Sequence, residues 1–153
     1  MNADNIEISR AGLLDIPKIV EIENTLFPDP WNEEAFRDVL FYYSNTFFTV
    51  KNGGDILGFI TAGIEDTSEA VYGHIMNIAV VPEYRKMGLG GRLMQRIEYE
   101  FLVCGAEGSQ LEVRVSNGDA ISFYRKQGYS QVMVVGGYYN NGEDAVLMMK
   151  WFE

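Results

Sequence analysis

The segment from Arg85 to Gly91, with the sequence Arg-Lys-Met-Gly-Leu-Gly-Gly, carries the residue types that bind a pyrophosphate. It follows an apolar stretch that indicates a strand ending at Val81, and it precedes residues with helical spacing. Glycines let a ligand approach the backbone closely, and the first N–H groups of a helix carry a positive partial charge. Arg85 and Lys86 add formal charge. The loop therefore predicts a pyrophosphate anchor at a strand–helix junction.

Two common nucleotide-binding loops do not fit this segment. A Walker loop ends in Gly-Lys-Ser or Gly-Lys-Thr, whereas this one has Gly90-Gly91-Arg92. The dinucleotide fingerprint needs a third small residue three positions after its second glycine, and Leu93 occupies that position when the count starts from Gly88 and Gly90. The remaining pattern is Arg-x-x-Gly-x-Gly, which a structural turn before a helix would also explain.

Three side chains elsewhere could take part in proton transfer. Glu112 lies in the middle of an apolar strand, which is unusual for a carboxylate, although it could also be an exposed residue paired with Arg114 on the same face. Tyr124 is a candidate acid or an ordinary core aromatic residue. His74, the one histidine of the sequence, has a structural reading as well. A metal held by His74 and Glu112 would have two ligands, which do not define a site, so no metal is expected.

Hydrophobic spacing and turn residues predict the elements that position these side chains. Helices are expected after Asp15 and after Asn32, each of which could cap one, and at 89–103 and 117–127. Strands are expected at 6–8, 46–50, 56–64, 71–81, 110–115, 129–135 and 145–151, with a glycine turn at 52–55. This order predicts an α/β (α+β) fold with a mixed, mostly antiparallel central sheet of about seven strands and helices on both faces.

Composition excludes several classes of protein. The length of 153 residues predicts a single domain, residues 1–153, and a net charge of −10 without a basic run argues against nucleic acid as a partner. A single cysteine, Cys104, allows no internal disulfide. No apolar run approaches the ~20 residues that cross a bilayer, so no membrane partner is expected. Residues 1–4 lack the features of a signal peptide, and the expected compartment is the cytoplasm.

The chain from Ile6 to Lys150 resembles the GNAT superfamily of N-acetyltransferases, block by block. The blocks that carry the resemblance are, in chain order, Asn77–Pro82, the Arg85–Gly91 loop, Leu111–Asn117, and Ala120, Phe123, Tyr124, Gly128 and Tyr129. Tyr138-Tyr139 and Gly142–Ala145, with Met148 beyond, resemble the protein N-terminal acetyltransferases, which include bacterial ribosomal-protein-alanine enzymes. Gly73-His74-Ile75 is similar to the archaeal N-alpha-acetyltransferases.

The resemblance implies acetyl-CoA as co-substrate and CoA as product. The cofactor contacts it implies are Ile78, Ala79, Val80, Arg85, Lys86, Met87, Gly88, Leu89, Gly90, Gly91, Asn117 and Tyr124. Asn117 could serve in addition as a helix cap. Glu112 matches the general base, Tyr124 the acid that protonates the CoA sulfur, and His74 a residue that relays a proton or positions water. Phe27, Pro28 and Asp29 would form one wall of the substrate groove, with Tyr138 and Tyr139 opposite. Asp29 stands where some archaeal relatives have a glutamate, so its reach is shorter.

The acceptors that this resemblance implies are the N-termini of proteins or peptides. An α-amine titrates near ~8 and a lysine near ~10.4, so a weaker base suffices for an α-amine. A small-molecule amine or a lysine ε-amine as acceptor, and a non-catalytic acyl-CoA sensor, remain alternatives. The expected state is a monomer or weak homodimer, and action close to the ribosome fits the resemblance to ribosomal-protein enzymes.

Overall fold

Within residues 5–153, which this computed structural model describes, seven strands and four α-helices follow the predicted order. The strands are β1 Ile6–Arg10, β2 Phe47–Asn52, β3 Asp55–Asp66, β4 Val71–Val80, β5 Gly108–Arg114, β6 Ser130–Val135 and β7 Ala145–Trp151. The helices are α1 Ile16–Leu26, α2 Glu33–Tyr42, α3 Leu89–Val103 and α4 Gly118–Lys126, with 3-10 segments η2 Leu13–Asp15, η3 Ser44–Thr46 and η4 Pro82–Met87. Residues 1–4, on which the signal-peptide expectation rests, lie outside the described residues.

The strands form a sheet in the order β1-β2-β3-β4-β5-β7-β6. The β1–β2, β2–β3, β5–β7 and β6–β7 pairs are antiparallel, and β4 and β5 are parallel. Parallel neighbours need a crossover, which the chain makes through α3. The mixed, mostly antiparallel sheet predicted from the sequence is confirmed.

The chain groups into two units, and β3 and β4 each run from one into the other. The first unit holds residues 5–63 and Asn77–Glu100, and the second holds Ile64–Met76 and Phe101–Glu153. The prediction of a single domain stays a prediction.

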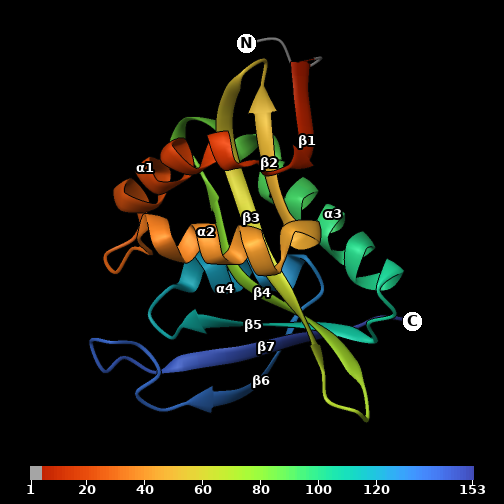
Figure 1. Cartoon of the computed structure of the whole chain (residues 1–153). Helices are drawn as coiled ribbons and strands as arrows, with labels where there is room; N and C mark the ends of the chain where they lie inside the picture. The colour runs from red at the N-terminus through yellow and green to blue at the C-terminus, as the bar shows by residue number, and fades with distance from the viewer. Residues whose placement is uncertain (1–4) are drawn as a thin grey trace. The chain divides into compact units, whose positions relative to one another are not determined.

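The first unit has helices on both faces of its strands (Figure 1). Phe47 and Phe48 are consecutive on β2, so their side chains point to opposite faces. The Phe47 ring lies 6.3 Å from the ring of Phe36 on α2, and the guanidinium of Arg96 on α3 lies 4.9 Å from the Phe48 ring. Burial of such a side chain stabilises the fold by about 1.5–3 kcal/mol. Buried residues of α1 and β3 belong to the same core as Phe36 and Phe47, among them Ile16, Ile19, Ile22 and Phe59.

In the second unit β5, β7 and β6 lie side by side (Figure 1). The Tyr129 hydroxyl donates to Ser109 Oγ on β5 at 2.8 Å in the interior, at the point where the chain leaves α4. Gly73 on β4 has the ring of Phe101 packed where a Cβ would lie. Any larger residue there would displace the ring or the strand, so this glycine lets Phe101 pack against β4 beside His74.

Two of the three predicted helix caps are confirmed. The side-chain oxygens of Asn32 and Asn117 accept from the backbone N–H groups of Ala35 at 2.8 Å and Ala120 at 3.2 Å, which confirms both caps. Asp15 precedes α1, but the expected cap bond is absent from its described contacts. Its carboxylate accepts from the Gly12 N–H and pairs with Lys51 at 2.9 Å instead. The strand predicted from residue 46 begins one residue later.

None of the helices in the described part of the chain is both long and apolar enough to span a membrane.

Candidate active site

The predicted pyrophosphate loop lies in the first unit, between β4 and α3. Gly88 has φ +74 and ψ 15, a left-handed conformation that strains any residue with a side chain. A Cβ at Gly88 would meet nothing within 4 Å, so the backbone angle, and not crowding, requires the glycine. The first α-helical bond joins the Arg92 N–H to the Gly88 carbonyl at 3.1 Å. The N–H groups of the preceding first turn, at 89–91, therefore have no partner within the helix and can bind an anion.

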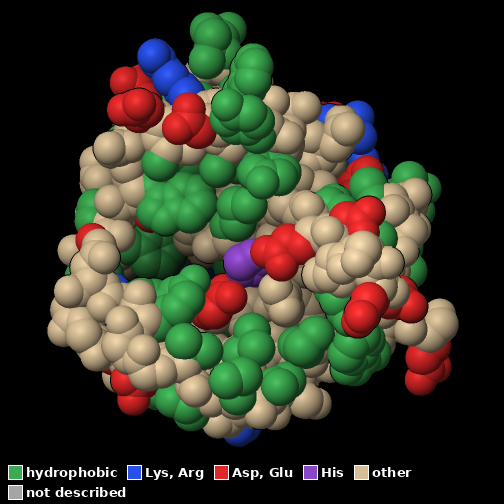
Figure 2. Space-filling view, turned by 60° about the horizontal axis from the view of Figure 1, so that its bottom comes forward, with side chains coloured by type: hydrophobic (Ala, Val, Ile, Leu, Met, Phe, Trp, Pro, Cys, Tyr) green, Lys and Arg blue, Asp and Glu red, His purple; other side chains and the backbone are tan. Residues whose placement is uncertain are grey.

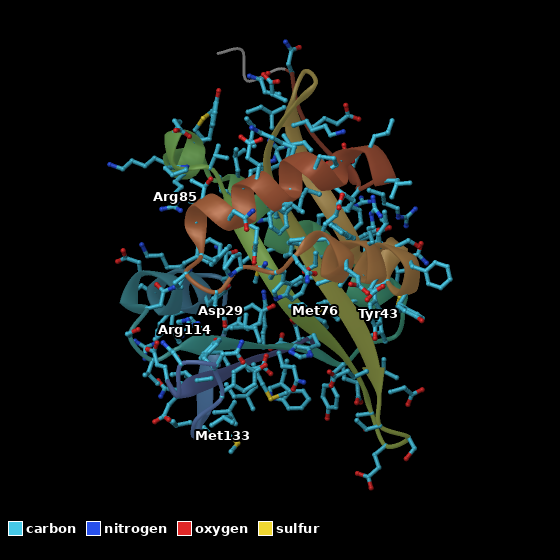
Figure 3. All side chains as sticks on the ribbon, turned by 60° about the vertical axis from the view of Figure 1, so that its left-hand side comes forward. Asp29, Tyr43, Met76, Arg85, Arg114 and Met133 are labelled. Atoms are coloured by element: carbon cyan, nitrogen blue, oxygen red, sulfur yellow. The ribbon has the colours of Figure 1, made fainter. Side chains whose placement is uncertain are left out.

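Arg85 lies in η4, before the glycines (Figure 3). Its Nε donates to the carbonyl of Val80 at 3.2 Å, so the side chain is held against the end of β4. This contact keeps a positive charge beside the loop, as an anion site requires. Lys86 and Met87 on the same segment are exposed.

The β4 backbone next to this loop is the predicted partner of an extended ligand arm. The parallel ladder between β4 and β5 joins Tyr72–His74 to Gly108–Gln110 and ends there. Ile78, Ala79 and Val80 continue β4 beyond this ladder. A Cβ at Gly58 on β3 would lie 2.5 Å from the Ala79 carbonyl oxygen, so this glycine permits the close approach of the two backbones.

In the second unit, Glu112 on β5 is the centre of a polar cluster. His74 Nε2 lies 2.7 Å from Glu112 Oε2, and the Tyr138 hydroxyl also hydrogen-bonds to the carboxylate. The Glu112 side chain is 16% exposed, which is low for a carboxylate. Arg114, labelled in Figure 3, pairs with Glu143 at 3.1 Å and stacks on the Tyr139 ring at 4.0 Å. The alternative in which Glu112 pairs with Arg114 is therefore wrong.

His74 has a second carboxylate neighbour that the sequence did not indicate. Its Nδ1 lies 2.7 Å from Oε1 of Glu65 on β3, and Gln110 Nε2 donates to the other oxygen of Glu65 at 3.2 Å. Figure 2 shows the histidine side chain next to acidic side chains at the surface. Within the described residues, no group of three or more His, Cys, Asp and Glu side chains has a geometry that could hold a metal ion.

The two carboxylates determine the charge of His74. A neutral imidazole has one N–H, so it can donate to one carboxylate and not to both. The hydrogen bond to Glu112, opposed by burial and assisted by the charges of Glu112 and Glu65, raises the pKa of His74 above 6.5. The site therefore favours an imidazolium that donates from both nitrogens.

The tyrosines of this cluster are held in the neutral, proton-donating form. Burial, with a further contribution from Tyr139, raises the pKa of Tyr124 on α4 well above its usual value. Burial and the neighbouring Tyr138 raise the pKa of Tyr139 to about 12. Burial and Glu112 raise the pKa of Tyr138. Each phenol therefore keeps its proton at neutral pH, which suits a general acid or a hydrogen-bond donor.

Comparisons with known proteins show the family to which the chain belongs. The model of the acetyltransferase (GNAT) family matches residues 16–129. The chain belongs to this family. An N-alpha-acetyltransferase of Sulfurisphaera tokodaii is 35% identical over 150 residues, which cover 92% of this chain and 90% of the relative. The [ribosomal protein bS18]-alanine N-acetyltransferase of Escherichia coli K12 is 31% identical over 144 residues, which cover 92% of this chain and 94% of the relative.

The GNAT assignment agrees with the three-dimensional comparison. The crystal structure of Ard1 from Thermoplasma volcanium superposes with a TM-score of 0.90 at 24% identity, over 97% of this chain and 99% of that chain. At this identity the likeness supports the fold.

The residues that resemble GNAT site residues fall into two groups, one in each unit. The first unit contains Ile78–Val80, Arg85–Gly91 and, in the loop between α1 and α2, Phe27, Pro28 and Asp29. Asp29 is labelled in Figure 3. The second unit brings together His74, Glu112, Tyr138 and Tyr139, and adds Tyr124 through its interaction with Tyr139. Asn117 also lies there and caps α4, and its predicted contact with the cofactor stays a prediction.

A buried carboxylate of the first unit was missed by the sequence analysis. Glu23 on α1 is 2% exposed, and it accepts from the Trp31 N–H at 3.0 Å and from Asn77 Nδ2 at 2.6 Å. It therefore holds the end of the Phe27–Asp29 loop against the start of the predicted ligand-binding part of β4. A glutamate four residues before Phe27 on a helix with an apolar stripe carries no local signal of this role.

Proposed function

We propose that this protein transfers the acetyl group of acetyl-CoA to the N-terminal α-amine of proteins or peptides. The observation that carries the proposal is the half-enclosed carboxylate of Glu112, which receives hydrogen bonds from His74 and Tyr138 in a member of an acetyltransferase family. Two relatives above 30% identity that match nearly the whole chain are named for acetylation of α-amines or of a ribosomal-protein alanine.

The first unit supplies the groups that would hold the co-substrate. When bound, acetyl-CoA supplies the activated acetyl thioester. The N–H groups at 89–91, which have no partner within the helix, and the charges of Arg85 and Lys86 fit its pyrophosphate, because they combine a helix N-terminus with formal charge. The β4 backbone at Ile78–Val80 is suited to pair with the pantetheine amides. The Asn117 side chain is the candidate contact from the second unit.

The second unit supplies the proton chemistry. Glu112 takes a proton from the acceptor ammonium, directly or through water, so that the amine nitrogen can bond to the acetyl carbon. Tyr124 gives its proton to the sulfur as the carbon–sulfur bond breaks, and its raised pKa keeps that proton available until this step. His74 is the candidate for relaying a proton or positioning water beside Glu112. The nitrogen loses a second proton as the amide forms, and transfer of that proton through water restores Tyr124, while the proton held by Glu112 leaves to solvent.

Aromatic residues of the second unit are candidates for binding the acceptor chain. Tyr138 is exposed and Tyr139 is half-buried, so both rings present an apolar face with a polar tip. The two rings are suited to contact an extended peptide. In the first unit, Phe27, Pro28 and Asp29 are the candidates for further contacts with the acceptor.

Incubation with acetyl-CoA and short peptides that begin with Ser, Ala or Met-Leu tests the proposal. We expect a mass gain of one acetyl group on the α-amine, located by fragmentation. Each peptide needs two matched controls, one with its N-terminus blocked and one with a blocked N-terminus and an internal lysine. Transfer to the blocked lysine peptide, to a polyamine or to a free amino acid in place of the α-amine would contradict the acceptor. Binding of CoA without any turnover would favour a sensor.

Three finer expectations accompany this function as proposals. They are a cytoplasmic location, a monomer or weak homodimer, and action close to the ribosome. Native mass spectrometry measures the oligomeric state, and co-sedimentation with ribosomes tests action close to the ribosome.

A further inference from the structure

Glu65 is a carboxylate with no role in the proposed reaction, yet it contacts the catalytic cluster directly. It lies near the end of β3, nine residues before His74 in the sequence and across the turn that joins β3 to β4. One of its oxygens lies 2.7 Å from His74 Nδ1, and the other accepts from Gln110 Nε2. Both oxygens are thus committed, and the side chain is fixed in one orientation although it is 46% exposed.

The contacts of His74 form a continuous path from Glu65 to Glu112. The ring is 21% exposed and lies between the two carboxylates, with 2.7 Å on each side. The charged groups that face the ring are Glu65 from β3 and Glu112 from β5. If Glu65 were neutral, an imidazole with its one proton on Nε2 would satisfy Glu112, and the second proton of an imidazolium, on Nδ1, would have no charged partner.

We infer that Glu65 is a positioning residue of the catalytic cluster, which acts through His74. Its carboxylate accepts from Nδ1, fixes the plane of the ring, and stabilises the imidazolium that donates from Nε2 to Glu112. The catalytic carboxylate is then held by His74 on one side and Tyr138 on another. Its remaining lone pairs stay available for the acceptor ammonium, because a carboxylate has about four acceptor positions.

The expected effect of Glu65 on kcat rests on the proposed function. Its expected effect on the titration of His74 rests on geometry alone. The electrostatic consequence can be measured without any substrate. His74 is the only histidine of the sequence, so in a chain without a histidine tag one imidazole signal reports its titration by NMR.

The variant Glu65→Gln removes the charge and keeps the size of the side chain. We expect its His74 titration midpoint to lie below that of the wild type, because one of the two carboxylates that stabilise the imidazolium is gone. Glu69→Gln is the matched control, since it makes the same change in the turn between β3 and β4, and we expect the wild-type midpoint there. Equal midpoints for Glu65→Gln and the wild type would overturn the inference.

Kinetics separate a positioning role from a merely structural one. We expect kcat of Glu65→Gln to fall about 10-fold near neutral pH, less than the ~10²–10⁴-fold that a general base contributes, with KM for acetyl-CoA unchanged. The ratio of variant to wild-type kcat should decrease as pH rises, because the wild type keeps its imidazolium to higher pH. Glu65→Asp keeps a carboxylate and should recover part of the loss. A kcat for Glu65→Asp as low as that of Glu65→Gln would contradict the inference.

The two proposals fail in different ways. If no N-terminal peptide is acetylated by the wild type, the proposed function is wrong, and the NMR titrations still decide whether Glu65 controls His74. If peptides are acetylated and the Glu65→Gln variant matches the wild type in kcat at every pH, the role of Glu65 is wrong and the function stands.

Discussion

The glycine loop of the first unit and the Glu112 cluster of the second present their polar groups in different ways. The loop offers backbone N–H groups, and its residues are consecutive, from Arg85 to Gly91. The cluster consists of side chains from three strands and a loop, with Glu65, His74, Glu112 and Tyr138 brought together by strand pairing. The loop is a backbone site formed by residues adjacent in sequence, and the cluster is a side-chain site formed by residues distant in sequence.

This difference predicts which substitutions should affect cofactor binding and which should affect the chemical rate. A backbone site depends on φ and ψ angles, so its weak points are glycines in the left-handed region. A side-chain site depends on charge and hydrogen-bond partners, so its weak points are titratable groups. Cofactor affinity and chemical rate should therefore respond to separate sets of substitutions.

The largest effect is expected for Glu112→Gln. It removes the base and leaves an amide that can still accept from His74 Nε2, so the cluster keeps its arrangement. We expect kcat to fall by about 10²–10⁴-fold, the range for a general base. The affinity for CoA, measured by calorimetry, should not change, because the predicted pyrophosphate anchor belongs to the other unit.

A fall in CoA affinity as large as the fall in kcat would contradict the assignment of cofactor binding to the first unit and of proton transfer to the second. Untouched turnover with Glu112→Gln would point to another base. Thermal unfolding of the variant serves as the control for folding.

The counterpart in the first unit is Gly88→Ala. The left-handed backbone at φ +74 costs a residue with a Cβ about 1–2 kcal/mol. We expect KM for acetyl-CoA to rise about 5- to 30-fold, which is that cost expressed as a ratio, while kcat stays near the wild-type value. Gly53→Ala is the matched control, because Gly53 has φ +62 in an open hairpin turn far along the chain from the loop. An equal rise in KM for both variants would show that the effect is global destabilisation.

Several elements of both units could be predicted from local sequence signals. The helix Leu89–Val103 and the strand Ala145–Trp151 have the predicted bounds, because apolar spacing marks the first and the turn at 140–142 precedes the second. Asn32 and Asn117 cap as expected, since each needs only the three residues that follow it. Asp15 was read by the same rule and fails, because Lys51 from a distant strand and the Gly12 N–H compete for its carboxylate.

The partners within the second region could not be read in the same way. His74 and Glu112 are 38 residues apart, and their contact depends on the register of β4 against β5. Glu65 ends an apolar strand, where a glutamate is ordinary, so nothing local distinguishes it from a solvated residue. The one usable signal was the short turn after β3, which makes β3 and β4 neighbours. The pairing of Arg114 with Glu143, and not with Glu112, likewise depends on tertiary structure.

The pH dependence of stability should also differ between the regions. The folded pKa of His74 is raised above 6.5, so its contribution is fully present below that pH and is lost as pH rises through the folded pKa. The difference in free energy of unfolding between the wild type and His74→Gln should therefore shrink as pH rises. Burial raises the pKa of Glu23 above 4.5, so the stability gained by protonating this carboxyl group is present below that pH and is lost as pH rises through the folded pKa. The free energy of unfolding of the wild type relative to Glu23→Gln should therefore begin to fall at acid pH. Urea unfolding at a series of pH values measures both, and a pH-independent difference for His74→Gln would contradict the assignment.

The smallest effects concern the two asparagine caps, one in each unit. Replacing Asn32 or Asn117 by Ala should cost about 1 kcal/mol, and Asp should retain the cap because it accepts the same backbone hydrogen bond. In a chain of this size that cost lowers Tm by about 2–4 °C. Asn117→Asp keeps the cap but has no side-chain N–H to donate to a pantetheine carbonyl. If Asn117 also binds the co-substrate, this variant should raise KM for acetyl-CoA at unchanged Tm, whereas Asn32→Asp should leave both unchanged. An unchanged KM in both Asp variants would mean that Asn117 acts only as a cap, and the proposed backbone contacts to the co-substrate would then come from the first unit.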